Sequence, residues 1–145
     1  MKRDSWLPVG TGEITIDSAA EESVCPRMWG EAYETKSPKR KLRFVNASGG
    51  EMGHYGEKVA TFRAQGQDAV VSLGFQVSDV QKPLAAVWRI AEMGNVVHFG
   101  PEDADNYIMN KATGKRIQMV RKAGSYVTEA DYVSAETGFA RPAAA

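Results

Sequence analysis

The chain has 145 residues and a mass of 15.8 kDa, which suits a single domain with one hydrophobic core. Its 18 basic and 18 acidic residues cancel, so the chain lacks the broad positive field that binding to a nucleic-acid backbone requires. One cysteine excludes an intrachain disulfide, and no apolar run is long enough for a signal peptide or a membrane span. We therefore expect an intracellular protein that binds neither nucleic acid nor a membrane.

Short apolar runs between glycine, proline and Asn/Asp breaks predict a mostly-β domain. After an N-terminal extension, residues 1–12, the first predicted strand is Glu13–Asp17. Lys41–Val45 and Gly56–Phe62 are predicted to pair as neighbouring strands. The glycine-rich segment Asn46–Gly50 follows the first of them and is typical of a hairpin turn.

The second half of the chain continues this pattern and adds one helix. Val70–Val77 predicts a half-buried strand, and Pro83 marks the turn into a helix over Leu84–Met93 that Gly94 ends. Further strands are predicted at Asn95–Phe99, Asn106–Asn110, Arg116–Val120, Tyr126–Thr128 and Asp131–Val133, with Lys111–Lys115 as a hairpin turn. We expect the domain to span residues 13–133 and the remainder, 134–145, to form a flexible tail.

The most informative segment of the chain surrounds Asp17. This aspartate ends an alternating apolar strand and is followed at once by small residues, which allow the backbone to turn tightly. The segment Ile14–Val24 resembles the Asp-Ser/Thr-Gly-Ala loop of retropepsin-like aspartic proteases, which continues with two acidic residues, a Ser or Thr, and a Val. Ala19 departs from this pattern, because the family has glycine at that position.

The order of the other segments resembles the protease region of copia-type retrotransposon polyproteins, over roughly residues 13–133. Each further signal is weak alone, and the resemblance rests on their shared order. The matching segments are Phe44–Gly50, His54–Gly56, Val77–Val87, Gly94, Val97–Phe99, Thr113–Gly114 and Tyr126–Val127. The resemblance implies a retropepsin-like closed β-barrel or sheet domain with one short helix, active as a homodimer.

The resemblance also implies a chemistry. Retropepsin-like enzymes are aspartic endopeptidases that hydrolyse peptide or polyprotein substrates with a water molecule held between two aspartates, without a metal or cofactor. Here the pair would be Asp17 from each of two chains, and Ser18 would hydrogen-bond across the two-fold axis beside Ala19. The substrate contacts implied by the resemblance are Ala20 and Glu21 of the loop, and Ser48, Gly49 and Gly50 at the tip of a flap.

A rival interpretation follows from Ala19. If the backbone there requires a positive φ, alanine costs roughly 1–2 kcal/mol, and the chain is a catalytically inactive dimerisation or peptide-binding module. A third possibility is a monomeric β-barrel binding domain unrelated to proteases. Such a small-residue loop does not follow the aspartates later in the chain, which are Asp68, Asp79, Asp103, Asp105 and Asp131.

Other conspicuous residues have simpler interpretations. The basic run Lys36–Lys41 is expected to be a solvated loop. His54 and His98 are too far apart in sequence to indicate a metal site and are expected to be structural. Cys25 is expected to be a buried thiol. The tryptophans are expected to be core anchors or packing caps; they are Trp6, Trp29 and Trp88.

Overall fold

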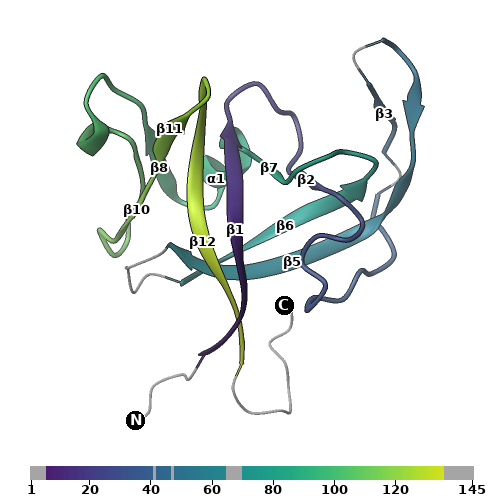
Figure 1. Cartoon of the computed structure of the whole chain (residues 1–145), viewed down its shortest axis with the longest axis horizontal. Coiled ribbons are helices and arrows are strands. Elements are labelled where there is room, and N and C mark those ends of the chain that lie inside the picture. Colours follow the sequence, from purple (N-terminus) through teal and green to yellow (C-terminus); the bar gives the residue numbers. More distant parts are fainter. Residues whose placement is uncertain (1–5, 41, 47, 65–69, 136–145) are drawn as a thin grey trace.

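Strands dominate the computed structural model, which describes residues 6–40, 42–46, 48–64 and 70–135 (Figure 1). The strands are β1 (Trp6–Asp17), β2 (Val24–Cys25), β3 (Phe44–Val45), β4 (Glu51–Met52), β5 (His54–Ala64), β6 (Val70–Ser78), β7 (Leu84–Ala86), β8 (Asn95–His98), β9 (Tyr107–Asn110), β10 (Arg116–Gln118), β11 (Val120–Lys122) and β12 (Ser125–Ala135). The helices are α1 (Val87–Glu92) and the 3-10 helix η1 (Asp103–Asp105). The predicted mostly-β architecture with one short α-helix is confirmed.

The described strands form three sheets. The largest has the order β1-β7-β2-β6-β5-β12-β11, and β1 also pairs antiparallel with β12 from Trp6 to Ile16. The strands β8, β9 and β10 form a second sheet, and β3 and β4 form a separate short hairpin. The prediction was a closed barrel or a sheet domain, and the described strands form the sheet domain without a closed barrel. The two smaller sheets pair only among their own strands.

The hydrophobic core lies against the large sheet. Ile14 of β1 and Phe75 of β6 are fully buried at its centre. The ring of Trp29 packs edge-on against Phe75, with 4.8 Å between ring centroids, and against Tyr132 at 5.3 Å. Its indole N–H also donates a hydrogen bond to the Tyr132 hydroxyl at 3.0 Å. Trp29 thus anchors the loop after β2 to the core, as predicted.

The helix is shorter than the sequence predicted. Leu84–Ala86 forms the strand β7, which pairs in parallel with Thr15–Asp17 of β1, so helical backbone begins only at Val87. A helix over this segment would lose these ladder bonds. The predicted end is confirmed, because Gly94 takes the left-handed backbone conformation at φ +95°.

Several strands have bounds that sequence reasoning missed. β1 begins at Trp6 rather than Glu13, since its first half pairs with the end of β12. The last predicted β segment, made of Tyr126–Thr128 and Asp131–Val133, is the strand β12, which begins at Ser125 and extends to Ala135. The predicted strand Arg116–Val120 is divided between β10 and β11. Residues 136–145 of the expected tail lie outside the described residues.

The simpler interpretations of single residues largely hold. Cys25 is fully buried, and this burial raises the pKa of its thiol to about 12. His54 hydrogen-bonds Gln76, and His98 hydrogen-bonds the backbone carbonyl of Asp105, so both have structural partners. Trp88, expected to be a core anchor or a packing cap, is 45% exposed on α1 and is therefore not a core anchor.

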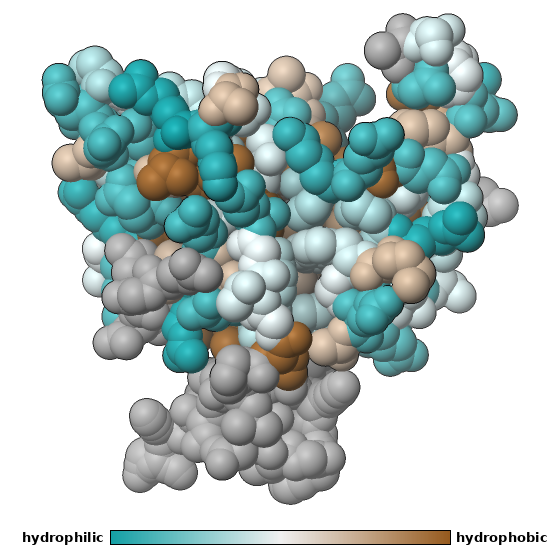
Figure 2. All heavy atoms as spheres, viewed as in Figure 1, coloured by the Kyte–Doolittle hydropathy of each residue, from teal (hydrophilic) through white to brown (hydrophobic). Residues whose placement is uncertain are grey.

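The surface in the view of Figure 2 is largely hydrophilic, with hydrophobic residues scattered singly. Two features of that view lead to the candidate site. The β3–β4 hairpin stands away from the body at one corner, and the loop between β1 and β2 emerges on the same side (Figure 1). Lys36, Lys39 and Arg40 of the basic run are exposed, as predicted for a solvated loop, while Lys41 lies outside the described residues.

Candidate active site

Asp17 lies where β1 leaves the sheet. The three residues before it, Ile14–Ile16, are buried, whereas Asp17 is half-buried and its neighbours Ser18 and Ala19 are exposed. Asp17 is in register with Ala86 of β7, and the backbone N–H of Thr15 donates to the Pro83 carbonyl at 3.2 Å. The strand pairing thus fixes the backbone of Asp17 and leaves its carboxylate partly exposed to solvent.

The Asp17 side chain closes a tight turn. Its Oδ1 accepts a hydrogen bond from the backbone N–H of Ala19 at 2.9 Å, the geometry of an Asx turn. Its Oδ2 accepts no hydrogen bond from the described residues, so one carboxylate oxygen is available to a water molecule, substrate or partner chain. The small residues after Asp17 therefore do what the sequence predicted, which is to let the chain turn beside the carboxylate.

Ala19 fits this turn without backbone strain. Among the described residues other than glycine, Ala123 alone has a positive φ, at 52°. Ala19 thus adopts a backbone conformation that any residue can take. The expected strain of roughly 1–2 kcal/mol from a left-handed conformation at this position is absent. The effect of the alanine on a catalytic site is therefore limited to the space that its methyl group occupies.

The second half of the loop is fastened to β7 and α1. The hydroxyl of Ser23, which is buried, accepts a hydrogen bond from the backbone N–H of Ala86 at 2.9 Å. The carbonyl of Glu21 accepts one from the exposed indole of Trp88 at 2.7 Å. Because hydrogen bonds from β7 and α1 hold these two residues, the loop is framed by the structure beneath it.

An ion-pair network reinforces this frame. Glu22 contacts Arg89 of α1 at 2.9 Å and Arg40 of the basic loop at 3.3 Å. Burial acts to raise the pKa of Glu22, but the hydrogen bonds and charges of the two arginines outweigh it and hold the pKa below its ordinary value. Glu22 is therefore ionised near neutral pH and links the loop to two other segments of the chain.

The predicted flap is a hairpin with a well-defined tip. Oδ1 of Asn46 accepts hydrogen bonds from the backbone N–H groups of Ser48 at 3.0 Å and Gly50 at 2.9 Å. Gly49 takes φ +89°, which favours glycine, and all three tip residues are exposed. No hydrogen bond among the described residues joins this tip to the Asp17 loop. The predicted site residues thus form two groups, 17–21 and 48–50, on one side of the molecule (Figure 1).

Other aspartates are engaged away from Asp17. Asp79 accepts hydrogen bonds from the backbone N–H of Gly53 at 2.9 Å and from the Tyr55 hydroxyl at 2.8 Å, and these bonds lower its pKa. Asp131 is in register with Thr11, six positions along β1 from Asp17, which corresponds to roughly 20 Å along a strand. Asp68 lies outside the described residues.

Sequence reasoning missed the residues that frame the loop. The sequence predicts Trp88 and Arg89 only as part of a longer helix, and nothing in their spacing points to Glu21 or Glu22. The one available signal is the juxtaposition of an exposed aromatic and a cation on a short helix, where the guanidinium of Arg89 lies 4.1 Å from the Trp88 ring centroid. That signal becomes interpretable only once β7 brings α1 beside the loop.

Two negative observations bound the chemistry of the described residues. They contain no group of three or more His, Cys, Asp or Glu side chains that is arranged to hold a metal ion. Neither of their helices is long and apolar enough to cross a bilayer. Comparisons with protein-family models, with curated proteins and with solved structures found no match to this chain.

Proposed function

We propose that this chain is an aspartic endopeptidase of the retropepsin-like type, in which two copies each supply Asp17. The observation that carries the proposal is the placement of Asp17: its backbone is fixed by strand pairing, one carboxylate oxygen is held by Ala19, and the other is open. Catalytic carboxylates need this combination of a rigid backbone and an accessible oxygen. The sequence resemblance, including its copia-type origin, supports the same assignment.

In this proposal the two Asp17 carboxylates face one another across a two-fold axis. Two such groups a few ångströms apart do not both ionise, so one keeps a proton and the pair titrates as a unit. The ionised carboxylate takes a proton from the bound water as it attacks the peptide carbonyl carbon. The protonated carboxyl donates its proton to the carbonyl oxygen as charge develops there. As the C–N bond breaks, the carboxyl that took the proton from water passes it to the amide nitrogen, and the other carboxylate takes a hydroxyl proton back from the tetrahedral intermediate.

The substrate in this proposal is an extended peptide segment. It would lie between the Asp17 loop and the β3–β4 hairpin, where Gly49 and Gly50 leave backbone groups without side-chain cover. Main-chain hydrogen bonds would supply affinity, as when a peptide adds a strand to a sheet. Ala20 and Glu21 on the loop and Ser48 on the hairpin are then positioned to contact the peptide backbone.

A second candidate is favoured by Ala19. In a dimer built around Asp17, the exposed loop of one chain faces the loop of the other, and a methyl group at position 19 occupies space that glycine leaves open. A displacement of about 1 Å in a reacting group lowers a rate on the order of a hundredfold. The alternative is therefore a dimeric peptide-binding module that retains the fold of a protease without its activity.

The test is cleavage of a diverse peptide library between about pH 4 and 7, the range in which a shared-proton pair works. Asp17→Asn should abolish cleavage, and Asp103→Asn, the same change at an exposed aspartate of η1, should leave it intact. If the wild-type chain cleaves no peptide, Ala19→Gly separates the two candidates. Cleavage that appears in this variant supports the alternative, in which Ala19 makes the natural chain an inactive module. Cleavage that survives in Asp17→Asn would refute the assignment of this residue.

A further inference from the structure

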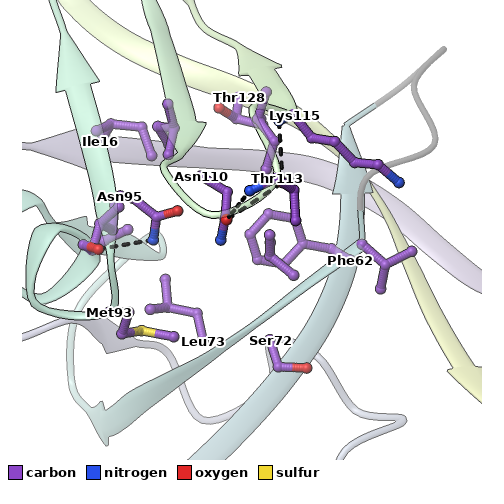
Figure 3. Close-up of a pocket in the computed structure, with 16 residues that line it drawn as sticks. Ile16, Phe62, Ser72, Leu73, Met93, Asn95, Asn110, Thr113, Lys115 and Thr128 are labelled. Atoms are coloured by element: carbon purple, nitrogen blue, oxygen red, sulfur yellow. Dashed lines mark hydrogen bonds between the residues drawn. The ribbon is translucent and has the colours of Figure 1, made fainter.

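A cavity of about 250 Å³ lies between β6, α1 and the three-stranded sheet (Figure 3). Its walls are mainly apolar and include Ile16, Phe62, Leu73, Ile90, Ile108 and Ile117. The volume corresponds to about eight water molecules in the liquid and exceeds the roughly 150 Å³ of an apolar cavity that accepts benzene. None of the predicted site residues lines it, so this space is separate from the candidate active site.

Two asparagines give this apolar cavity a polar side. Asn95 of β8 and Asn110 of β9 are direct partners in the antiparallel pair, so their side chains project from the same face of the sheet. Both line the cavity, and Figure 3 shows their amide groups pointing into the space bounded by Leu73, Met93 and Phe62. The register of the sheet therefore places two amides side by side inside the cavity.

Backbone hydrogen bonds fix the orientation of each amide. Nδ2 of Asn95 donates to the carbonyl of Ile90 at 2.9 Å. Oδ1 of Asn110 accepts from the N–H groups of Ala112 at 2.9 Å and Thr113 at 3.0 Å. The two atoms left over, Oδ1 of Asn95 and Nδ2 of Asn110, have no hydrogen-bond partner among the described residues. The cavity thus presents one acceptor and one donor next to each other.

We propose that this cavity binds a small uncharged molecule that combines an apolar ring with a primary carboxamide or lactam group. In such a group an N–H and the C=O lie on the same edge, so one can donate to Asn95 and the other accept from Asn110. A secondary amide prefers the trans form, which directs its N–H and C=O to opposite sides. Lys115 also lines the cavity, but Figure 3 shows its amine pointing away from the two asparagines. A carboxylate would therefore face the acceptor oxygen of Asn95 and be repelled.

The experiment is a titration of the full-length ¹⁵N-labelled protein with benzamide, followed through the side-chain NH₂ signals of Asn95 and Asn110. We expect both signals to shift, with a Kd on the order of 1 mM for a ligand of this size. N-methylbenzamide, which keeps the ring and amide but not the matching edge, should bind at least about threefold more weakly. Benzoate should be weaker than benzamide.

A matched pair of variants tests the donor. Asn110→Asp keeps the oxygen that caps its turn and removes Nδ2, so benzamide binding should fall about tenfold. Asn46→Asp makes the same change in the hairpin tip, where Oδ1 has the equivalent turn-capping role, and should leave binding unchanged. Equal affinity of both variants, or of benzamide and N-methylbenzamide for the wild type, overturns the proposal. So does preferential binding of benzoate, or an absence of shifts at about 10 mM benzamide.

Discussion

The hydroxyl of Ser23 is the least replaceable contact in the frame of the Asp17 loop. It accepts the hydrogen bond of the Ala86 N–H at 2.9 Å, and neither residue is more than 3% exposed. Ser23→Ala removes the acceptor and leaves this N–H buried without a partner. Water cannot replace the lost bond at a site from which solvent is excluded.

The size of the stability loss in Ser23→Ala follows from that burial. An unsatisfied buried backbone donor costs about 1–3 kcal/mol, because the group keeps its desolvation penalty and loses its bond. Taking about 2 kcal/mol, the melting temperature of a chain of this size should fall by roughly 4–8 °C. Urea unfolding followed by tryptophan fluorescence measures the loss directly, and amide hydrogen exchange should show faster exchange of the Ala86 N–H.

Ser37→Ala is the matched control, since it makes the same chemical change at an exposed position of the basic loop. Its free energy of unfolding should stay within about 0.5 kcal/mol of wild type. If Ser23→Ala is no more destabilising than Ser37→Ala, the N–H of Ala86 has another partner and the frame described for the loop is wrong.

Three further predictions concern the surroundings of the loop. Gly56→Ala should destabilise the fold by about 2–4 kcal/mol, since φ is +148° and a Cβ would lie 2.3 Å from the Lys36 carbonyl oxygen. Gly74→Ala, where the space is open, should change stability by less than about 1 kcal/mol in the same urea assay. Equal effects of the two variants would contradict this prediction. The pKa of Glu22 is lower in the native protein than its ordinary value of 4.5, so this residue stabilises the fold above about pH 4.5 and loses that contribution as the pH falls through its native pKa. The free energy of unfolding measured between about pH 5 and 3 should therefore decline less steeply in Glu22→Gln than in wild type. The thiol of Cys25, with its pKa raised to about 12, should not react with a disulfide reagent near pH 8 until denaturant is added, and rapid reaction of the native protein would exclude the burial described.

The sequence predicted the elements whose patterns are local. Alternation identified the strand ending at Asp17, and glycine identified the C-terminal end of α1 and the tip of the β3–β4 hairpin. These features depend on side-chain period and on left-handed backbone conformations, both of which a single segment reveals. The small residues after Asp17 similarly predicted the tight turn that the structure contains.

The elements that sequence reasoning missed depend on distant partners. Leu84–Ala86 resembles a helix start in isolation and becomes a strand because β1 lies in parallel beside it. The first half of β1 has few strand signals and is ordered by pairing with β12, whose residues are more than a hundred positions away. Long-range pairing overrides local propensity in both cases. The contacts of Trp88 and Glu22 follow from the same arrangement and were equally invisible.

The most direct test of the proposed function is a mixing experiment on a substrate that the wild-type chain cleaves. A fixed amount of wild-type protein is allowed to exchange subunits with an equal amount of Asp17→Asn, and cleavage is compared with that of the same amount of wild-type protein alone. If each active site needs Asp17 from two chains, random exchange places about half of the wild-type chains in mixed, inactive dimers, and the rate should fall by about half. An unchanged rate after complete exchange, shown by the mass of the mixed dimer, would contradict a catalytic site shared between two chains.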